Sequence, residues 1–215
     1  RAPKSPKPLP KALSVDDAQV LADYLPGSDP EALRDHALIE LAYSCGLRRA
    51  ELVSLDWRYH KAEGYESRSW LDLAQAEAHV LGKGRKRRTV PVGRQALAAL
   101  QAWLAVRSQL LQPRSSDDAR AALFIGKRGA RLSDGVLYQR VVALSQRAGV
   151  AARVHPHVLR HSAASHLLQS SGDLRAVQEF LGHANIGTTQ IYTRLDWQHL
   201  AKTYDAAHPR AKKKP

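Results

Sequence analysis

A histidine and an arginine stand three residues apart in the stretch His157-Val158-Leu159-Arg160. Residues with this spacing on a helix lie on the same face. An imidazole can take or give a proton near neutral pH, and a guanidinium can hold a planar anion through two parallel hydrogen bonds. The pair therefore suits chemistry on a phosphate or carboxylate, although a solvated helix face can carry the same two residues.

Two other basic positions have the setting that an anion-binding side chain needs. Arg48 stands where we expect a helix to begin, and backbone N–H groups at a helix start attract phosphate. Glu51 could orient the Arg48 guanidinium, or the two could form an ordinary surface ion pair. Lys83 stands in a glycine turn at residues 82–84. We expect DNA contacts from the four cations that follow it: Arg85, Lys86, Arg87 and Arg88.

The last candidates lie near the C-terminus. His183 stands just after the expected end of a helix, and Tyr192 comes nine residues later. A tyrosine beside Ile191 and Leu195 ordinarily fills a core or boundary position, yet a phenol beside a base can also act as a nucleophile. Each of these signals is ambiguous alone, and only their combination is specific.

Taken together, these residues resemble the catalytic set of the tyrosine site-specific recombinases, the phage integrase family. That set is an arginine, a lysine, a His-x-x-Arg pair, a histidine and a nucleophilic tyrosine. The matching positions, in the order and with the spacing of the family, are Arg48, Lys83, His157, Arg160, His183 and Tyr192. The resemblance spans about residues 13–210, nearly the whole chain.

Longer motifs place the chain more closely within the family. Five stretches are similar to the Xer branch, which resolves dimers of bacterial chromosomes: 155–161, 171–175, 181–185, 188–193 and 198–212. Three features depart from the usual pattern. Gly187 stands where a serine is common, Ala50 replaces a usual serine beside Arg48, and residues 58–70 look longer than typical. None of the three falls on a matched catalytic position.

The resemblance implies a phosphoryl transfer to a protein side chain. Tyr192 would attack a DNA backbone phosphate, forming a 3′-phosphotyrosine and a free 5′-hydroxyl. Arg48 and Arg160 would hold the non-bridging oxygens and stay protonated while negative charge develops there. His157 is the candidate base for the phenol, whose ordinary pKa is about 10.

The two other matched residues would complete the chemistry. Lys83 would protonate the departing 5′-oxygen as general acid, and His183 would hydrogen-bond the phosphate. Because the phosphotyrosine retains the bond energy, we expect rejoining to need no ATP, metal or other cofactor. The sequence contains no phosphate-binding loop motif and no cluster of Asp and Glu for two metal ions.

The same resemblance implies DNA and protein partners. We expect double-stranded DNA with a dif-like recombination site, a XerD-like partner recombinase in a heterotetramer, and the FtsK DNA translocase. Composition agrees with a DNA substrate, since 33 Lys and Arg against 20 Asp and Glu give a net charge of +13.

Cysteine content and hydropathy indicate the compartment. Cys45 is the single cysteine, which suits a reducing cytosol. No apolar run reaches the roughly 20 residues that a membrane helix needs. We therefore expect a cytoplasmic protein, and the resemblance to DNA recombinases implies that it is associated with the nucleoid.

The spacing of apolar residues and the positions of capping and glycine residues predict the helices and strands that must position these side chains. Ser14 is an expected N-cap, another short helix should begin near Glu51, and residues 58–75 show no clear period. Strand-like stretches at 77–81 and 87–92 predict a hairpin around the glycine turn. Further helices are expected over 30–44, 94–112, 133–148, 156–170, 174–181 and 188–195. By resemblance, the fold is a mostly helical domain with a small antiparallel β-sheet, as in tyrosine recombinase catalytic domains.

Three segments are expected along the chain. Residues 1–12 form a basic, proline-rich linker, residues 13–206 the catalytic domain, and residues 207–215 a basic tail. The chain begins at Arg1 and contains no methionine, so we expect it to be part of a longer protein. The family's N-terminal DNA-clamping domain would attach at the linker.

Four alternative functions stay open from the residues alone. A zinc enzyme is the least supported, because Val158 stands where the zinc-protease helix of the His157/His161 type needs a glutamate. Type IB topoisomerases use a similar set of arginines, lysine, histidine and tyrosine. A non-catalytic DNA-binding module would explain the charge but not the six matched residues. A phage or integron integrase is the nearest alternative within the family.

Overall fold

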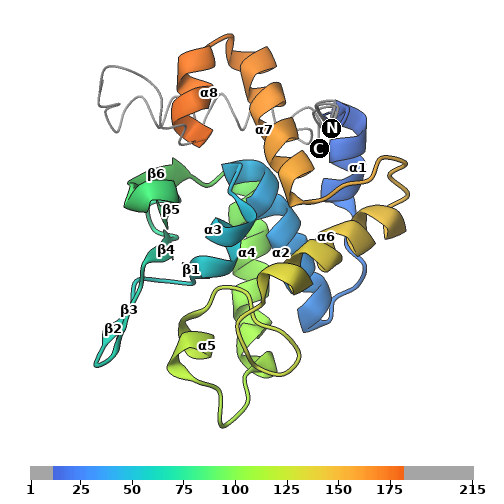
Figure 1. Cartoon of the computed structure of the whole chain (residues 1–215). Coiled ribbons are helices and arrows are strands. Elements are labelled where there is room, and N and C mark those ends of the chain that lie inside the picture. The colour runs from blue at the N-terminus through green and yellow to red at the C-terminus, as the bar shows by residue number, and fades with distance from the viewer. Residues whose placement is uncertain (1–11, 182–215) are drawn as a thin grey trace, which may run out of the picture.

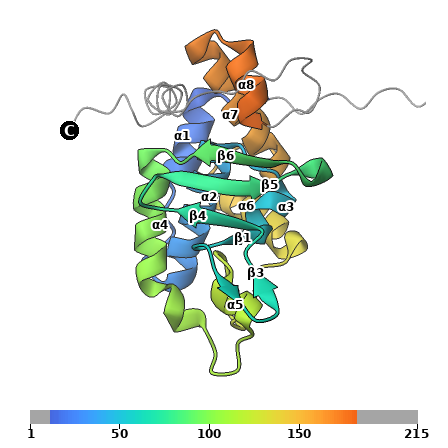
Figure 2. The ribbon, with the colours of Figure 1, turned by 90° about the vertical axis from the view of Figure 1, so that its left-hand side faces the viewer.

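The computed structural model describes residues 12–181, which form a mostly helical body with a small sheet on one side (Figures 1 and 2). The α-helices of this range are α1 (Val15–Asp23), α2 (Pro30–Cys45), α3 (Arg49–Ser54), α4 (Arg94–Val106), α5 (Asp117–Ala121), α6 (Asp134–Arg147), α7 (Pro156–Ser171) and α8 (Leu174–Leu181). Two short 3₁₀ segments are η1 (Lys83–Arg85) and η2 (Arg107–Leu110).

The main sheet has four strands in the order β1-β4-β5-β6. These strands are β1 (Leu55–Asp56), β4 (Ser69–Asp72), β5 (Glu77–Leu81) and β6 (Arg87–Pro91). β4, β5 and β6 pair antiparallel, as predicted, whereas the short β1 pairs parallel with β4, so the sheet is mixed. A separate hairpin joins β2 (Lys61–Ala62) to β3 (Tyr65–Glu66) and extends away from the sheet in Figure 1.

Helix α2 lies at the centre of the molecule. Leu38, Leu41 and Cys45 on this helix are fully buried, and α4 and α7 pack against it. In Figure 2 the strands lie across α2 and α4, and the inward side chains of the sheet, among them Val80 and Val90, belong to the same core. One continuous apolar core therefore supports the sheet and the helices that carry the candidate catalytic residues.

The predicted elements are found with small shifts of their ends, except for the helix expected over 188–195, which lies outside the described residues. Ser14 caps α1 by accepting a hydrogen bond from the Asp17 backbone N–H at 3.0 Å, and Ser133 caps α6 in the same way. The helix expected over 94–112 ends as α-helix at Val106 and continues as η2. No helix within residues 12–181 is both long and apolar enough to cross a membrane.

Residues 58–75, which show no clear period, contain β2, β3 and β4. Strands of two residues and a four-residue strand are too short to produce a recognisable alternation of apolar and polar side chains. The pairing of β2 with β3, and of β4 with β1 and β5, therefore could not be read from the sequence alone.

Candidate active site

Arg48 is held at the start of α3, as its position in the sequence predicts. It is the N-cap residue, with extended backbone at φ −70° and ψ 151°. Its backbone N–H donates to Glu51 Oε2 at 2.8 Å, and its Nη1 donates to Glu51 Oε1 at 3.0 Å. Glu51 thus fixes both the backbone and the guanidinium of Arg48, whose side chain stays 34% exposed.

Glu51 also binds a second arginine, from the other side of the site. Arg88 on β6 donates from Nη1 to Glu51 Oε1 at 2.7 Å and from Nη2 to Glu51 Oε2 at 2.8 Å. Burial acts to raise the pKa of Glu51, but the hydrogen bonds and charges of Arg88 and Arg48 outweigh it and lower this pKa below its ordinary value. The carboxylate therefore stays ionised and links β6 to α3.

Arg88 is one of the four cations predicted to contact DNA, and in the structure its guanidinium binds Glu51. Arg88 lies opposite Val80 in the β5–β6 register, on the inward face of the sheet. The signal that separates it from the exposed Arg87 is the alternation of side chains along a strand.

Arg160 is buried on the first turns of α7, with 6% exposure. Its Nη1 donates to the Gly46 carbonyl at the end of α2, and its Nη2 donates to the Leu181 carbonyl at the end of α8 at 2.6 Å. Burial, followed by the charges of Arg48 and Arg88, lowers the pKa of Arg160 to about 10. A pKa of about 10 still leaves the guanidinium charged at neutral pH.

Gly46 makes this arrangement possible. It ends α2 in the left-handed conformation, at φ 53°, and thereby turns its carbonyl toward Arg160. A Cβ atom at Gly46 would lie 2.8 Å from Phe180 Cε1, so α8 packs directly on the glycine backbone.

His157 stands one turn before Arg160 on α7, beside a second histidine. Its ring lies parallel to that of His155, with centroids 6.5 Å apart and 9° between the planes. His155 in turn stacks on Tyr138 of α6 at 5.9 Å. Burial and the nearby charges of His157 and Arg153 lower the pKa of His155.

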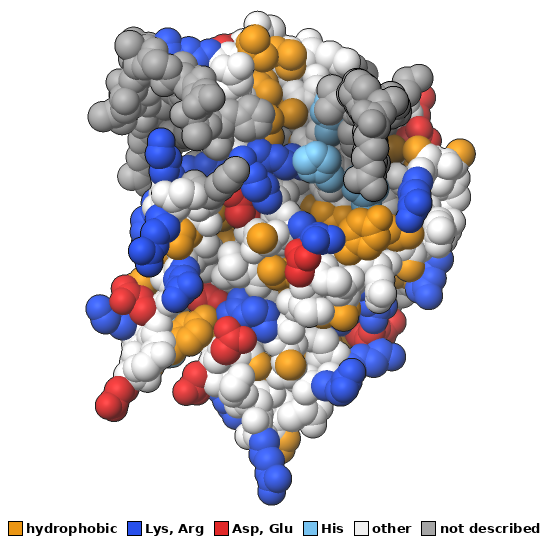
Figure 3. Space-filling view, viewed as in Figure 1, with side chains coloured by type: hydrophobic (Ala, Val, Ile, Leu, Met, Phe, Trp, Pro, Cys, Tyr) orange, Lys and Arg blue, Asp and Glu red, His pale blue; other side chains and the backbone are white. Residues whose placement is uncertain are grey.

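A hollow of about 580 Å³ brings these groups together between α3, α6 and α7. Arg48, His157 and Arg160 all line it. Arg49 and Asp134 form an ion pair of 2.5 Å at its edge, with the Arg49 guanidinium 5.5 Å from the centre of the Tyr138 ring. On the face shown in Figure 3, histidine side chains lie beside a group of Lys and Arg side chains. Two guanidiniums and an imidazole at one hollow can bind a phosphate and exchange a proton with a group attached to it.

Lys83 lies in the turn between β5 and β6, as predicted. The turn is closed by a hydrogen bond from Gly82 N–H to the Lys86 carbonyl at 2.8 Å, and Gly84 takes a left-handed conformation at φ 74°. Arg85, Lys86 and Arg87 are exposed on or beside this turn. The two remaining predicted residues, His183 and Tyr192, lie outside the described residues.

The histidines of α7 are the residues of this region that could bind a metal ion. His166 is committed to structural contacts, since one ring nitrogen lies 2.5 Å from the Tyr43 hydroxyl and the other 3.0 Å from the Leu13 carbonyl. Within residues 12–181, no three His, Cys, Asp or Glu side chains are grouped so that they could hold a metal ion.

Comparison with known proteins decides the family. Residues 11–199 match the phage integrase family. The chain belongs to the phage integrase family. A tyrosine recombinase XerC 1 of Ralstonia nicotianae is 64% identical over 214 residues, covering 100% of this chain and 65% of the relative. The resemblance of the chain's motifs to the Xer branch, and within it to XerC, is thereby confirmed.

Solved structures confirm the catalytic-domain fold of the phage integrase family. The crystal structure of XerA recombinase matches with a TM-score of 0.67 and 27% identity, over 100% of this chain and 68% of that one. A post-cleavage complex of XerH recombinase with a difH substrate matches with a TM-score of 0.62 and 25% identity, over 93% of this chain and 50% of that one. The chain spans 65% of the length of the Ralstonia nicotianae relative, just under two thirds.

Proposed function

We propose that this chain carries the DNA-cutting and rejoining site of a site-specific recombinase, with Tyr192 as the nucleophile. The observation that supports this most is the meeting of Arg48, His157 and Arg160 at one hollow. These residues come from two helices separated by more than a hundred residues of chain, so their convergence is a property of the fold.

The two arginines suit the phosphate. Attack on a phosphodiester builds negative charge on the non-bridging oxygens, and charged donors fixed in advance stabilise that charge. Arg48 is oriented by Glu51, and Arg160 by the Gly46 and Leu181 carbonyls. The protein has therefore positioned both guanidiniums before any DNA binds.

The bonds and protons balance without a cofactor. The Tyr192 oxygen forms a bond to phosphorus, and the bond from phosphorus to the 5′-oxygen breaks. His157 accepts the phenolic proton, and Lys83 donates a proton to the departing 5′-oxygen. The reverse transfers let a 5′-hydroxyl attack the phosphotyrosine and restore a phosphodiester, while His183 would hydrogen-bond the phosphate.

The proposed substrate is double-stranded DNA with a dif-like site. The similarity to a XerC protein and to a XerH protein bound to difH DNA supports this choice. Arg85, Lys86 and Arg87 are proposed to contact the DNA backbone beside the Lys83 turn, where they are exposed.

The proposed assembly is a heterotetramer with a XerD-like recombinase, in which the two proteins resolve chromosome dimers. FtsK is the further partner proposed for this process, which would take place at the nucleoid. In the proposed organisation, residues 13–206 are the catalytic domain, residues 1–12 a linker to an N-terminal DNA-clamping domain, and residues 207–215 a basic tail.

The test is covalent capture on DNA. A duplex with a nick close to the cleavage position loses a short fragment after cutting, so the protein–DNA adduct accumulates. We expect the full-length parent protein to form this adduct and Tyr192→Phe to bind the same DNA without forming it. An adduct with the Phe variant would remove Tyr192 from the nucleophilic role, and its absence with the parent protein would refute the proposed activity.

A further inference from the structure

Residues 58–70 look longer than is usual in the family, and the proposed chemistry gives them no role. In the structure this segment leaves the sheet after β1, forms the β2–β3 hairpin, and returns as β4 in the middle of the sheet. It therefore lies next to β5, the strand that leads into the Lys83 turn.

Side chains of this segment form an aromatic cluster on the outer face of the sheet. The Tyr59 ring meets the Trp70 ring edge to face at 5.0 Å, and Trp70 stacks on His79 of β5 at 4.8 Å. The Arg87 guanidinium of β6 lies 5.6 Å from the centre of the Trp70 ring. We call these four residues, Tyr59, Trp70, His79 and Arg87, the aromatic brace.

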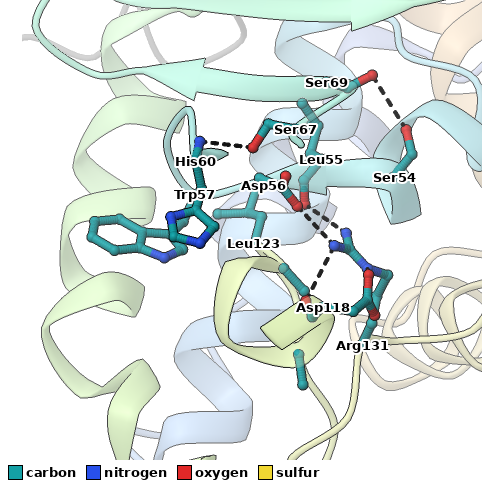
Figure 4. A network of polar contacts seen from close by, with 12 residues as sticks. Ser54, Leu55, Asp56, Trp57, His60, Ser67, Ser69, Asp118, Leu123 and Arg131 are labelled. Atoms are coloured by element: carbon teal, nitrogen blue, oxygen red, sulfur yellow. Dashed lines mark hydrogen bonds and ion pairs between the residues drawn. The ribbon is translucent and has the colours of Figure 1, made fainter. Parts of the chain in front are cut away.

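The base of the segment is anchored in the body of the protein (Figure 4). Asp56, which is 1% exposed, accepts a hydrogen bond from Arg131 at 2.7 Å, and Arg131 also binds Asp118 at 2.8 Å. At the next turn of the chain, the His60 backbone N–H donates to Ser67 Oγ at 2.8 Å. These hydrogen bonds and ion pairs hold the base of the segment that carries Tyr59 and Trp70.

The backbone of the Lys83 turn lies at an exposed end of the β5–β6 hairpin. Residues 84–87 are exposed, and Gly84 and Arg85 both have positive φ, at 74° and 59°. Arg87, which pairs with Leu81, is the first residue of β6 after the turn. Its contact with Trp70 therefore restrains the turn at its point of attachment.

The first two residues of β6, Arg87 and Arg88, are held on opposite faces of the sheet. Arg88 binds Glu51, which also orients Arg48, on the inner face. Arg87 lies on Trp70 on the outer face. Arg88 is thus linked through Glu51 to Arg48, the proposed phosphate-binding arginine, and Arg87 contacts the aromatic brace through Trp70.

We infer that the aromatic brace positions the Lys83 turn for proton donation to the departing 5′-oxygen, with Trp70 and Tyr59 as positioning residues. This inference rests on the proposed function, in which Lys83 is the general acid. General acids contribute roughly 100-fold or more to a rate, and small displacements lose much of that factor. Loss of the Trp70 ring should therefore slow cleavage of ordinary DNA far more than it weakens DNA binding, to which the retained Arg87 can still contribute.

The test compares two nicked duplexes that carry a dif site and differ in one atom. One has oxygen at the 5′-bridging position of the cleaved phosphate, and the other has sulfur, a leaving group that needs no proton. With full-length protein, we expect Trp70→Leu to slow adduct formation roughly 10- to 100-fold on the oxygen substrate and less than about 2-fold on the sulfur substrate. Trp70→Phe, which keeps an aromatic ring, should stay within about 3-fold of the parent on both.

Control variants separate this effect from a general loss of structure. Trp57→Leu removes a tryptophan that contacts Arg58 and the Arg120 carbonyl, and should not distinguish the two substrates. If Trp70→Leu does not fold, Tyr59→Leu decides by the same criterion, because Tyr59 is 46% exposed and its ring meets Trp70 directly.

The outcomes distinguish the brace from the proposed function. Equal slowing of Trp70→Leu on both substrates, or no slowing on either, would overturn the positioning role. Lys83→Ala, measured alongside, should be rescued by sulfur. If sulfur does not rescue Lys83→Ala, Lys83 is not the general acid and the inference about the brace is wrong as well. An inactive parent protein would instead refute the proposed function.

Discussion

Replacing Glu51 by glutamine tests how the protein orients its arginines. The carboxylate accepts four hydrogen bonds, at 2.8 and 3.0 Å from Arg48 and at 2.7 and 2.8 Å from Arg88. A glutamine has one acceptor oxygen, and its amide N–H groups would face the guanidinium donors. At least one of the two contacts with Arg88 must be lost, and both arginines lose their counter-charge.

The size of the effect follows from burial. Glu51 is 4% exposed and the Arg88 side chain 13%, so breaking their pair belongs with the loss of buried ion pairs, which costs about 3–5 kcal/mol. Water can rehydrate Arg48, whose side chain is 34% exposed, which favours the low end of that range. We therefore expect Glu51→Gln to lower the free energy of unfolding by about 3 kcal/mol.

The pH dependence of the free energy of unfolding provides a second test of the contacts of Glu51. The pKa of Glu51 in the folded protein is lowered from its ordinary 4.5, so its contribution is complete above pH 4.5 and is lost as pH falls through the folded value. The stability difference between parent and Glu51→Gln should accordingly shrink as the pH falls below 4.5.

Denaturant unfolding at several pH values measures this difference. Glu63→Gln is the matched control, because Glu63 is exposed and its replacement should change stability by less than about 0.5 kcal/mol. Adduct formation by Glu51→Gln should also fall roughly 10-fold or more, since Arg48 is no longer oriented. A variant as stable and as active as the parent would refute the reasoning that Glu51 organises the site.

Three further predictions follow from other contacts. Gly46→Ala should lower the free energy of unfolding by about 3 kcal/mol, because φ is 53° and the new Cβ would meet Phe180 at 2.8 Å; thermal unfolding measures it, and a shift no larger than for an exposed helix substitution would contradict the packing. Burial lowers the pKa of His166, so its contribution to stability is complete above pH 6.5 and declines as pH falls below 6.5, and His166→Gln should show a weaker decline than the parent. An unchanged pH profile would exclude His166 as its source. Lys83→Ala should cut the sulfur-bridged DNA nearly as fast as the parent and the ordinary DNA far more slowly, whereas slow cleavage of both would leave the lysine as a phosphate contact only.

Local signals in the sequence predict where several of the candidate residues lie in the fold. The spacing of His157 and Arg160 predicts that they share one helix face, and both line the hollow in the structure. Arg48 stands at the start of α3, as its position in the sequence predicts. From the sequence, Glu51 could either orient Arg48 or form a surface ion pair with it, and in the structure the buried Glu51 carboxylate binds both the backbone and the guanidinium of Arg48. These features depend on residues within one turn of each other, so the sequence carries them directly.

Contacts between distant segments could not be predicted in the same way. The bond from Arg88 to Glu51 joins residues 37 positions apart, and the Arg160 bond to Gly46 joins residues 114 apart. The stacking of Trp70 on His79 depends on the pairing of β4 with β5, which no period within residues 58–75 predicts. Such contacts depend on how strands pair and helices pack, which no local pattern specifies.

The most direct test of the account is to identify the atom that joins protein to DNA. The adduct formed by the full-length protein on a nicked dif duplex would be digested with protease and nuclease and analysed by mass spectrometry. If Tyr192 is the nucleophile, the adduct will carry a nucleotide attached through its 3′-phosphate to the peptide that contains Tyr192. A nucleotide on any other side chain, or one attached through its 5′-phosphate, would show that Tyr192 does not attack the phosphate as proposed.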